Sequence, residues 1–241
     1  MARAPRLALA GELHYLIQRG HNGQSVFADD ADRTAYLAML RVAAGQYGVA
    51  IHAYVLLDCE VHLAATPSEP EALSRLMQSL GRRYVAGYNR RHSRSGTLWS
   101  GRFRGAPIDS ITFGEELLVH IESQPSLAGL SADVEWPWSS VRHHLGRQRD
   151  PLVTEHAAYW ALGNTPFERE LAHAHNLRDG VPAALREGLT AAALRGRAFG
   201  TSAFSALVEM QSGRRTPARP RGRPPAKAAT LHKTDPIKIT E

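Results

Sequence analysis

Apolar and polar positions alternate along the first half of the chain in blocks that have the lengths of strands and helices. Two apolar runs, 51–57 and 61–65, flank a short polar connection and have the pattern of two buried strands joined by a tight turn. Three aspartates between positions 29 and 32 suit the N-terminus of a helix. In chain order the pattern predicts a strand at 13–18, a helix at 29–47, strands at 51–57 and 61–65, a helix from 69 to about 88, a strand within 96–108 and a helix at 112–123.

This βαββαβ order predicts an α+β fold, a ferredoxin-like antiparallel sheet with helices on one face. After Trp136 the pattern is helical and peripheral as far as about Phe204. We therefore expect a sheet domain over residues 1–145, a helical C-terminal extension over 146–210 and a tail over 211–241.

Composition limits the compartment that the protein can occupy and the kinds of cross-link that can stabilise its fold. With 43% hydrophobic residues, the 241-residue chain can build a core, and its single cysteine, Cys59, excludes an intrachain disulfide and a multi-cysteine zinc site. No apolar run has the length of a membrane span, and the N-terminus lacks the apolar segment of a signal peptide. We expect a bacterial cytoplasmic or nucleoid-associated protein without membrane association.

The charge is distributed very unevenly. From Gln211 onward eight basic residues stand against two acidic ones, which accounts for the whole net charge of +6. Between Ala72 and Ile108 there are eight arginines and no acid, and the rings of Tyr84, Tyr88 and His92 lie among them. Phosphate contacts from the arginines and base stacking on the rings would suit single-stranded or hairpin DNA, whereas the bland alternative is a solvated helix face.

The tail carries a second feature that suits DNA. Residues 219–225 read RPRGRPP and resemble an AT-hook, in which the Arg221-Gly222-Arg223 core would lie in an A·T minor groove. The alternative is a basic tail that attracts DNA of any sequence. Both interpretations predict a tail that is disordered without DNA.

Glu60 and His62 are two residues apart on a predicted strand, so their side chains leave the same face. A carboxylate and an imidazole in this arrangement can hold a divalent cation, although Glu-x-His pairs are also common by chance.

Several motifs agree in order and spacing with one known family. They are LHYLIQRGHN at 13–22, SRLMQSLGRRYV at 74–85, GTLWSGRFR at 96–104 and WPWSS at 136–140. In these motifs the chain resembles the REP-associated tyrosine transposases, which are single-strand DNA transposases of the HUH endonuclease superfamily. The resemblance covers roughly residues 3–204 and implies that residues 1–145 are a transposase-like HUH domain with a ferredoxin-like sheet.

The chain departs from that family at two site positions. In the family a His-hydrophobic-His segment binds the catalytic metal; here Glu60 takes the first position and only His62 matches. The family's nucleophilic tyrosine, in a Tyr-Ile-x-x-Asn/Gln-Pro pattern, corresponds to His120, while Gln124 keeps the position of a third metal ligand. Residues four apart share a helix face, so His120 and Gln124 should point to the same place.

The family reaction attacks a DNA phosphodiester with a tyrosine oxygen, so the resemblance implies DNA binding with strand cleavage lost or weakened. The first alternative is an active enzyme in which His120 replaces the nucleophile and Glu60, His62 and Gln124 hold Mg²⁺ or Mn²⁺. A second alternative is an RNA- or metabolite-binding domain. The residues expected to contact DNA are Arg19, Arg82, Arg83, Arg90, Arg91, Arg94, Arg102, Arg104, Arg221 and Arg223.

Overall fold

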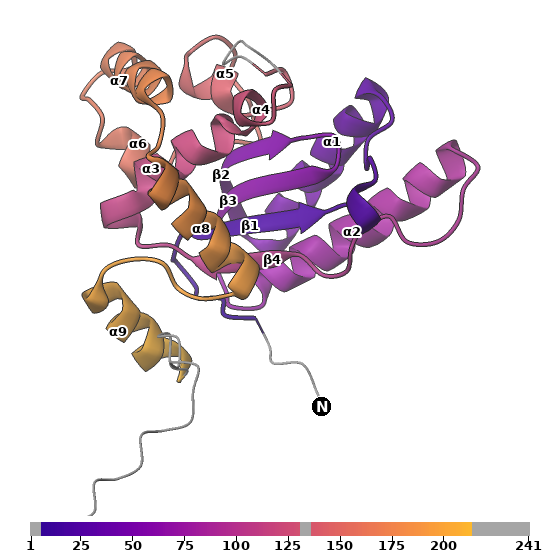
Figure 1. Cartoon of the computed structure of the whole chain (residues 1–241), viewed down its shortest axis with the longest axis horizontal. Coiled ribbons are helices and arrows are strands. Elements are labelled where there is room, and N and C mark those ends of the chain that lie inside the picture. The colour runs from indigo at the N-terminus through magenta and orange to yellow at the C-terminus, as the bar shows by residue number, and fades with distance from the viewer. Residues whose placement is uncertain (1–5, 131–135, 214–241) are drawn as a thin grey trace, which may run out of the picture.

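A four-stranded antiparallel sheet with the order β2-β3-β1-β4 forms the centre of the computed structural model, which describes residues 6–130 and 136–213 (Figure 1). The predicted βαββαβ order is confirmed. It comprises β1 (His14–Arg19), α1 (Asp30–Tyr47), β2 (Val49–Leu56), β3 (Glu60–Pro67), α2 (Ala72–Arg91) and β4 (Arg104–Pro107). The AT-hook-like segment with Arg221 and Arg223, and the whole predicted tail beyond Gly213, lie outside the described residues.

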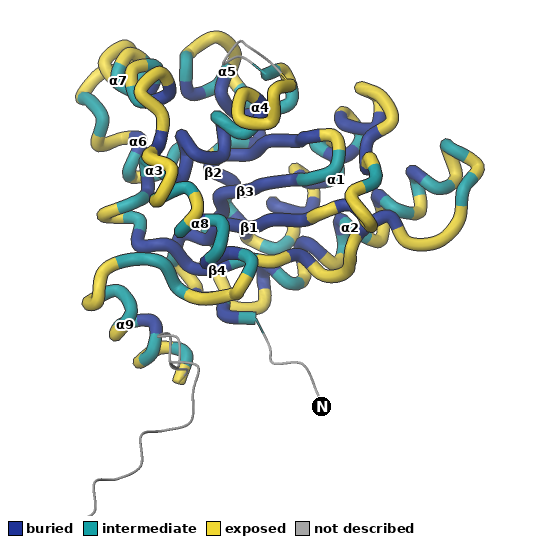
Figure 2. The backbone as a smooth tube through the Cα atoms, in the orientation of Figure 1, coloured by how far each residue is buried: buried dark blue, intermediate teal, exposed yellow. Residues whose placement is uncertain are grey.

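Strands β1, β2 and β3 are buried along nearly their whole length (Figure 2), and successive side chains of a strand point to opposite faces of the sheet. Leu16, Tyr54 and Leu63 join the core cluster beneath α1 and α2. Tyr15, Val55 and Ala64 join a second cluster on the opposite face. Both faces therefore need a cover, which is typical of a sheet whose strands are apolar throughout.

Helices α1 and α2 lie on one face, as the βαββαβ order predicts. The opposite face is covered by α3 (Ser110–Glu122) and α8 (Ala183–Arg195). Leu189 and Ala193 of α8 are fully buried against the sheet cluster, so this part of the extension is not peripheral and that prediction is wrong. The remaining elements are η1 (His21–Gly23), α4 (Gln124–Leu127), α5 (Val141–His144), α6 (Ala157–Trp160), α7 (Pro166–Asp179) and α9 (Ser202–Ser212).

Two local details position the site. The side chain of Asp29 accepts a hydrogen bond of 3.0 Å from the Asp32 amide and so begins α1, as the aspartate run predicts. At the same end of the sheet, the Leu57 amide donates to the Glu60 carbonyl at 2.9 Å, which closes the turn between β2 and β3. Within the described ranges no helix is both long enough and apolar enough to cross a lipid bilayer.

Candidate functional site

Tyr15 lies at the centre of a buried network between the sheet and α3. Its hydroxyl is 2.7 Å from Nδ1 of His62 and 3.2 Å from Nε2 of His120. All three side chains are buried, with exposed fractions of 0–2%. A phenol carries a single proton, so Tyr15 can donate to one imidazole and accept from the other.

Glu60 and His62 leave the same face of β3, as their spacing predicts. Glu60 Oε2 is 3.2 Å from His62 Nε2, and Oε1 is 3.0 Å from Nε of Arg19, which lies directly opposite Glu60 on β1. Burial alone would raise the pKa of the Glu60 carboxyl, but His62 and Arg19 outweigh it and lower that pKa. The carboxylate therefore joins Arg19 to His62.

His120 and Gln124 also lie together, although α3 ends at Glu122 and Gln124 begins the short helix α4. The Gln124 amide nitrogen donates to the His120 carbonyl at 3.0 Å and lies 3.3 Å from both ring nitrogens. Thr190 of α8 adds a hydroxyl 3.3 Å from His120 Nε2. Gln124 therefore contacts His120. These contacts do not direct its side chain at a metal ion held by Glu60 and His62.

The protonation states in this network follow from its burial. Burial, with smaller contributions from the charges of His62 and Arg186, lowers the pKa of His120 to about 3. Burial raises the pKa of the Tyr15 hydroxyl well above its ordinary value. At neutral pH the centre consequently holds a neutral imidazole at His120 and a protonated phenol at Tyr15.

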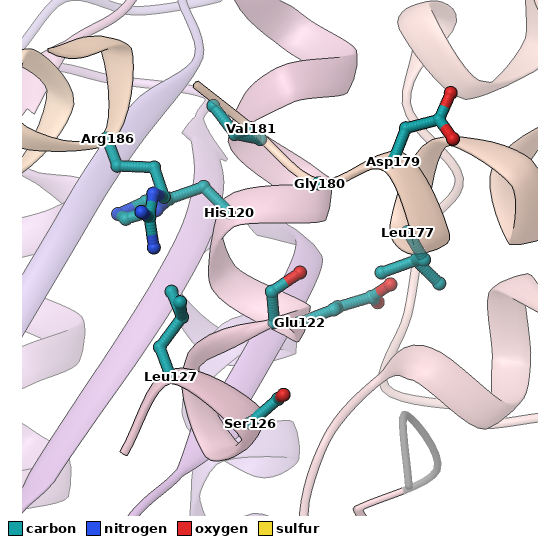
Figure 3. A pocket seen from close by; sticks show the side chains of 10 residues that line it. His120, Glu122, Ser126, Leu127, Leu177, Asp179, Gly180, Val181 and Arg186 are labelled. Atoms are coloured by element: carbon teal, nitrogen blue, oxygen red, sulfur yellow. The ribbon is translucent and has the colours of Figure 1, made fainter. Parts of the chain in front are cut away.

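A cavity of about 280 Å³ opens beside His120, between the end of α3 and the connection from α7 to α8. Figure 3 shows His120 and Arg186 on one side of it and Leu177 and Asp179 on the other. Arg186 and Thr190, both on α8, were not predicted, because nothing in the sequence places this late helix over the sheet.

A second buried cluster was also not predicted. Glu122 Oε1 is 2.7 Å from Nδ1 of His144, and Oε2 is 2.7 Å from Nε2 of His173. One ligand atom from each of these three residues lies within 4.8 Å of the others, a geometry that could hold a metal ion. Their positions in three separate helices give no spacing signal, although the adjacent pair His143-His144 is visible in the sequence.

Most of the predicted DNA-contacting arginines are exposed. Arg82 and Arg102 line an open groove of about 530 Å³ between α2 and the segment before β4, together with Gln18 and Gln78. Arg82, Arg83, Arg90, Arg102 and Arg104 are exposed, and none of the five pairs with an acid among the described residues. The groove is also lined by Glu71 and by Arg75, which pairs with Glu69 at 3.5 Å.

The other described arginines of the predicted set are already engaged. Arg91 pairs with Asp29 and Asp32 at 2.5 Å each, and Arg19 pairs with Glu60 at 3.0 Å. Arg94 lies over the Tyr88 ring, 5.5 Å from its centre. Arg91 therefore ties the end of α2 to the start of α1, and we do not retain it as a DNA contact.

Tyr84 and Tyr88 pack helix α2 against the core and do not present their rings to bases. Both rings are buried in the core beneath α1 and α2, with exposed fractions of 2% and 8%, and the Tyr84 hydroxyl donates to the Val26 carbonyl at 2.6 Å. His92 is bonded to Asp32 at 2.9 Å. These rings point inward because α2 buries its apolar stripe against α1 and the sheet.

No protein-family model matches the chain, and no curated protein matches it. Among solved structures it is similar to a REP-associated tyrosine transposase bound to a REP hairpin, with a TM-score of 0.53 and 17% identity over 66% of this chain and 96% of that one. A candidate transposase from Deinococcus radiodurans R1 matches 55% of this chain and 100% of its own length at 19% identity, but its TM-score of 0.36 is too low to support a conclusion.

The first of these similarities, together with the sheet order, defines the class. The chain has the α+β fold of the REP-associated tyrosine transposases, and the resemblance of its sequence motifs is confirmed at the level of the fold.

Proposed function

We propose that the protein binds single-stranded or hairpin DNA and has lost, or retains only weakly, the strand-cleaving activity implied by its transposase fold. One observation supports this most directly. His120 occupies the position expected for a nucleophilic tyrosine, and the phenol nearest to it, Tyr15, is fully buried between two imidazoles. A nucleophilic oxygen must reach phosphorus and lose its proton, and the burial of Tyr15 opposes both requirements.

Of the three side chains predicted to hold Mg²⁺ or Mn²⁺, only Glu60 and His62 contact each other. His62 contacts Tyr15 through Nδ1 and Glu60 through Nε2, and Gln124 contacts His120. Mg²⁺ also prefers oxygen ligands in octahedral geometry, which one carboxylate and one imidazole supply poorly. Glu60, His62 and Gln124 as arranged therefore do not fit Mg²⁺.

DNA binding is supported by the surface of exposed arginines on α2 and before β4. Guanidinium groups without a protein carboxylate partner are available for phosphates. Arg82 and Arg102 line the same groove, so a phosphodiester backbone lying in it would meet both.

A second candidate function, an active endonuclease, is favoured by the cavity beside His120. Arg186 brings a positive charge to the same cavity wall as His120, where it would suit a phosphate. Attack by the His120 imidazole would form a phosphorus–nitrogen bond and release the 3′- or 5′-oxygen of the cut strand.

One experiment separates the two functions. The full chain is incubated with a labelled single-stranded hairpin in Mg²⁺, in Mn²⁺ and in EDTA, and binding, nicks and denaturation-resistant adducts are measured. We expect binding in all three conditions and no cleavage. A covalent adduct that disappears in His120→Ala, while binding persists, would instead establish the active enzyme; absence of binding at low salt would refute both functions.

The groove arginines give a sharper test of the binding surface. Replacing Arg82 and Arg102 together by alanine should weaken hairpin binding at least about tenfold, because charge-assisted hydrogen bonds contribute about 1.5–3 kcal/mol each. The slope of log affinity against log salt should become shallower by about 2. Fluorescence anisotropy over a salt series measures both quantities.

The matched control is Arg178→Ala, which removes an exposed arginine of α7, on the extension. It should leave affinity and salt dependence close to those of the unchanged protein. Equal losses in the control and in the groove variant would place the DNA elsewhere.

We also propose that the tail contacts the minor groove of A·T-rich stems through Arg221 and Arg223. Replacing both by alanine should weaken binding to an A·T hairpin stem more than to a G·C stem, because only the A·T minor groove is narrow and strongly negative. A competition assay with the two stems measures the preference. Equal losses on both would leave a tail that attracts DNA through charge alone.

A further inference from the structure

A cluster of fully buried ionisable groups joins three helices on the side of α3 that faces away from the sheet network. Glu122 comes from the end of α3, His144 from α5 and His173 from α7, with exposed fractions of 0–1%. Glu122 contacts both histidines at 2.7 Å and also accepts a hydrogen bond from the Ser140 hydroxyl. We propose that Glu122, His144 and His173 form a structural site for a divalent transition-metal cation, with Zn²⁺ the best match to their chemistry.

The spacing of the ligand atoms suits such an ion. They lie within 4.8 Å of one another, and each histidine nitrogen is now at hydrogen-bond distance from one Glu122 oxygen. Zinc bonds to nitrogen and oxygen of about 2.0–2.2 Å put neighbouring ligand atoms about 3–3.5 Å apart. Replacing the two shared protons by the ion therefore requires shifts of less than about 1 Å, within reach of side-chain adjustment.

A supporting carboxylate stands behind one of the histidines. Nδ1 of His173 is 2.7 Å from Glu115 Oε1, and the Asn176 amide donates to the same oxygen at 3.1 Å. Metal-binding histidines usually donate their second ring N–H to a carboxylate in this way, because it fixes the ring orientation and makes the other nitrogen a better ligand. His173 thus has its Nε2 directed at Glu122 and its Nδ1 held from behind.

Protons alone leave the cluster incompletely satisfied. His144 Nε2 and Glu115 Oε2 are buried and have no hydrogen-bond partner among the described residues. A second proton on His144 would therefore be a buried donor without an acceptor. A single charged imidazole balances only one of the two negative charges on Glu115 and Glu122. A divalent cation between neutral imidazoles would balance both.

The donor set identifies the kind of ion. Two imidazole nitrogens and one carboxylate suit Zn²⁺ and related transition metals, while Mg²⁺ and Ca²⁺ prefer shells made of oxygen. The burial of both histidine ligands is typical of a structural rather than a catalytic site, because a catalytic ion keeps a position open to substrate; Glu122 also borders the cavity beside His120. Glu122 can offer both of its oxygens to complete the coordination.

The test uses the full chain, stripped with a chelator and then given zinc alone. We expect about one zinc per chain by elemental analysis and a melting temperature that rises with zinc concentration. When Co²⁺ replaces Zn²⁺, the protein should show the visible absorption bands of Co²⁺ with a low coordination number and nitrogen ligands. The variants His144→Gln and His173→Gln should lose the zinc-dependent rise.

The control is His175→Gln, which changes an exposed histidine of the same helix α7, paired with Asp179 at 3.1 Å. It should bind zinc as the unchanged protein does. A parallel variant, Glu60→Gln with His62→Gln, tests the sheet network as the source of binding.

Three results would overturn the proposal: no zinc uptake by the unchanged protein, uptake that persists in His144→Gln and His173→Gln, or uptake that is lost only in the Glu60/His62 variant. If the cluster variants fail to fold, the unchanged protein still decides, because X-ray absorption of its bound zinc must show two imidazole ligands. DNA binding plays no part in these readouts, so the two proposals fail independently.

Discussion

Replacing Glu122 by alanine should lower the free energy of unfolding by about 3–5 kcal/mol, which is the cost typical of removing one partner from a buried ionic group. The change leaves His144, His173 and the Ser140 hydroxyl without their common acceptor. It also opens a space at the junction of α3, α5 and α7. Urea unfolding of metal-stripped protein, followed by circular dichroism, measures the loss.

The comparison is Glu187→Ala, which removes an exposed glutamate of α8 and should change the free energy of unfolding by less than about 0.5 kcal/mol. Glu122→Gln should fall between the two, because the amide keeps one acceptor oxygen but directs an N–H group at a histidine. A loss below 1 kcal/mol in Glu122→Ala would show that the buried cluster does not form.

The stability of the metal-stripped protein should be greatest near pH 6.5 and fall on both sides. On the acid side, burial lowers the pKa of His14 and His52 to about 4 and that of His120 to about 3, against 6.5 when unfolded. The unfolded chain therefore binds protons more readily below pH 6.5, and stability is lost as the pH falls from there towards 4. At pH 5 each histidine costs up to about 2 kcal/mol.

On the alkaline side the sign is reversed for His173. Burial alone would lower its pKa, but the hydrogen bonds to Glu115 and Glu122 raise it to about 10. Its contribution to stability is fully present below pH 6.5 and is lost as the pH rises towards 10.

The urea concentration at the midpoint of unfolding, measured at pH 5, 6.5 and 8.5, tests the loss of stability on both the acid and the alkaline side. His120→Gln should make the fall in stability on the acid side shallower, since it removes one of the five described histidines whose pKa burial lowers, and should leave the fall on the alkaline side unchanged. A stability that keeps rising from pH 6.5 to 8.5 would contradict the assignment of a charged His173.

The strand pair around Asp58 and the i, i+4 relation of His120 and Gln124 could be predicted because both depend on local periodicity. The same rule predicts that the side chains of Glu60 and His62 lie on one face of β3, and the structure shows them in contact. Tyr15 could not be placed among them, because its position depends on the register between β1 and β3, in which Ile17 lies opposite His62. That register becomes known only when the sheet order is known.

The remaining surprises come from contacts between distant segments. Arg91 looked available for DNA because its own segment contains no acid, yet Asp29 and Asp32 reach it from α1. Glu122, His144 and His173 meet only because α5 and α7 fold back over the end of α3. Periodicity describes one element at a time, so it cannot show which side chains of two elements face each other.

Helix α3 has an unusual consequence for motion. His120 and Glu122, separated by one residue, are held in two different buried networks, one against the sheet and one beneath the extension. A rotation of α3 that broke the contacts of His120 would also break those of Glu122, so neither network can come apart alone. The amide protons of residues 118–121 should accordingly exchange with solvent only when the whole fold opens, which makes this helix a reporter of global rather than local unfolding.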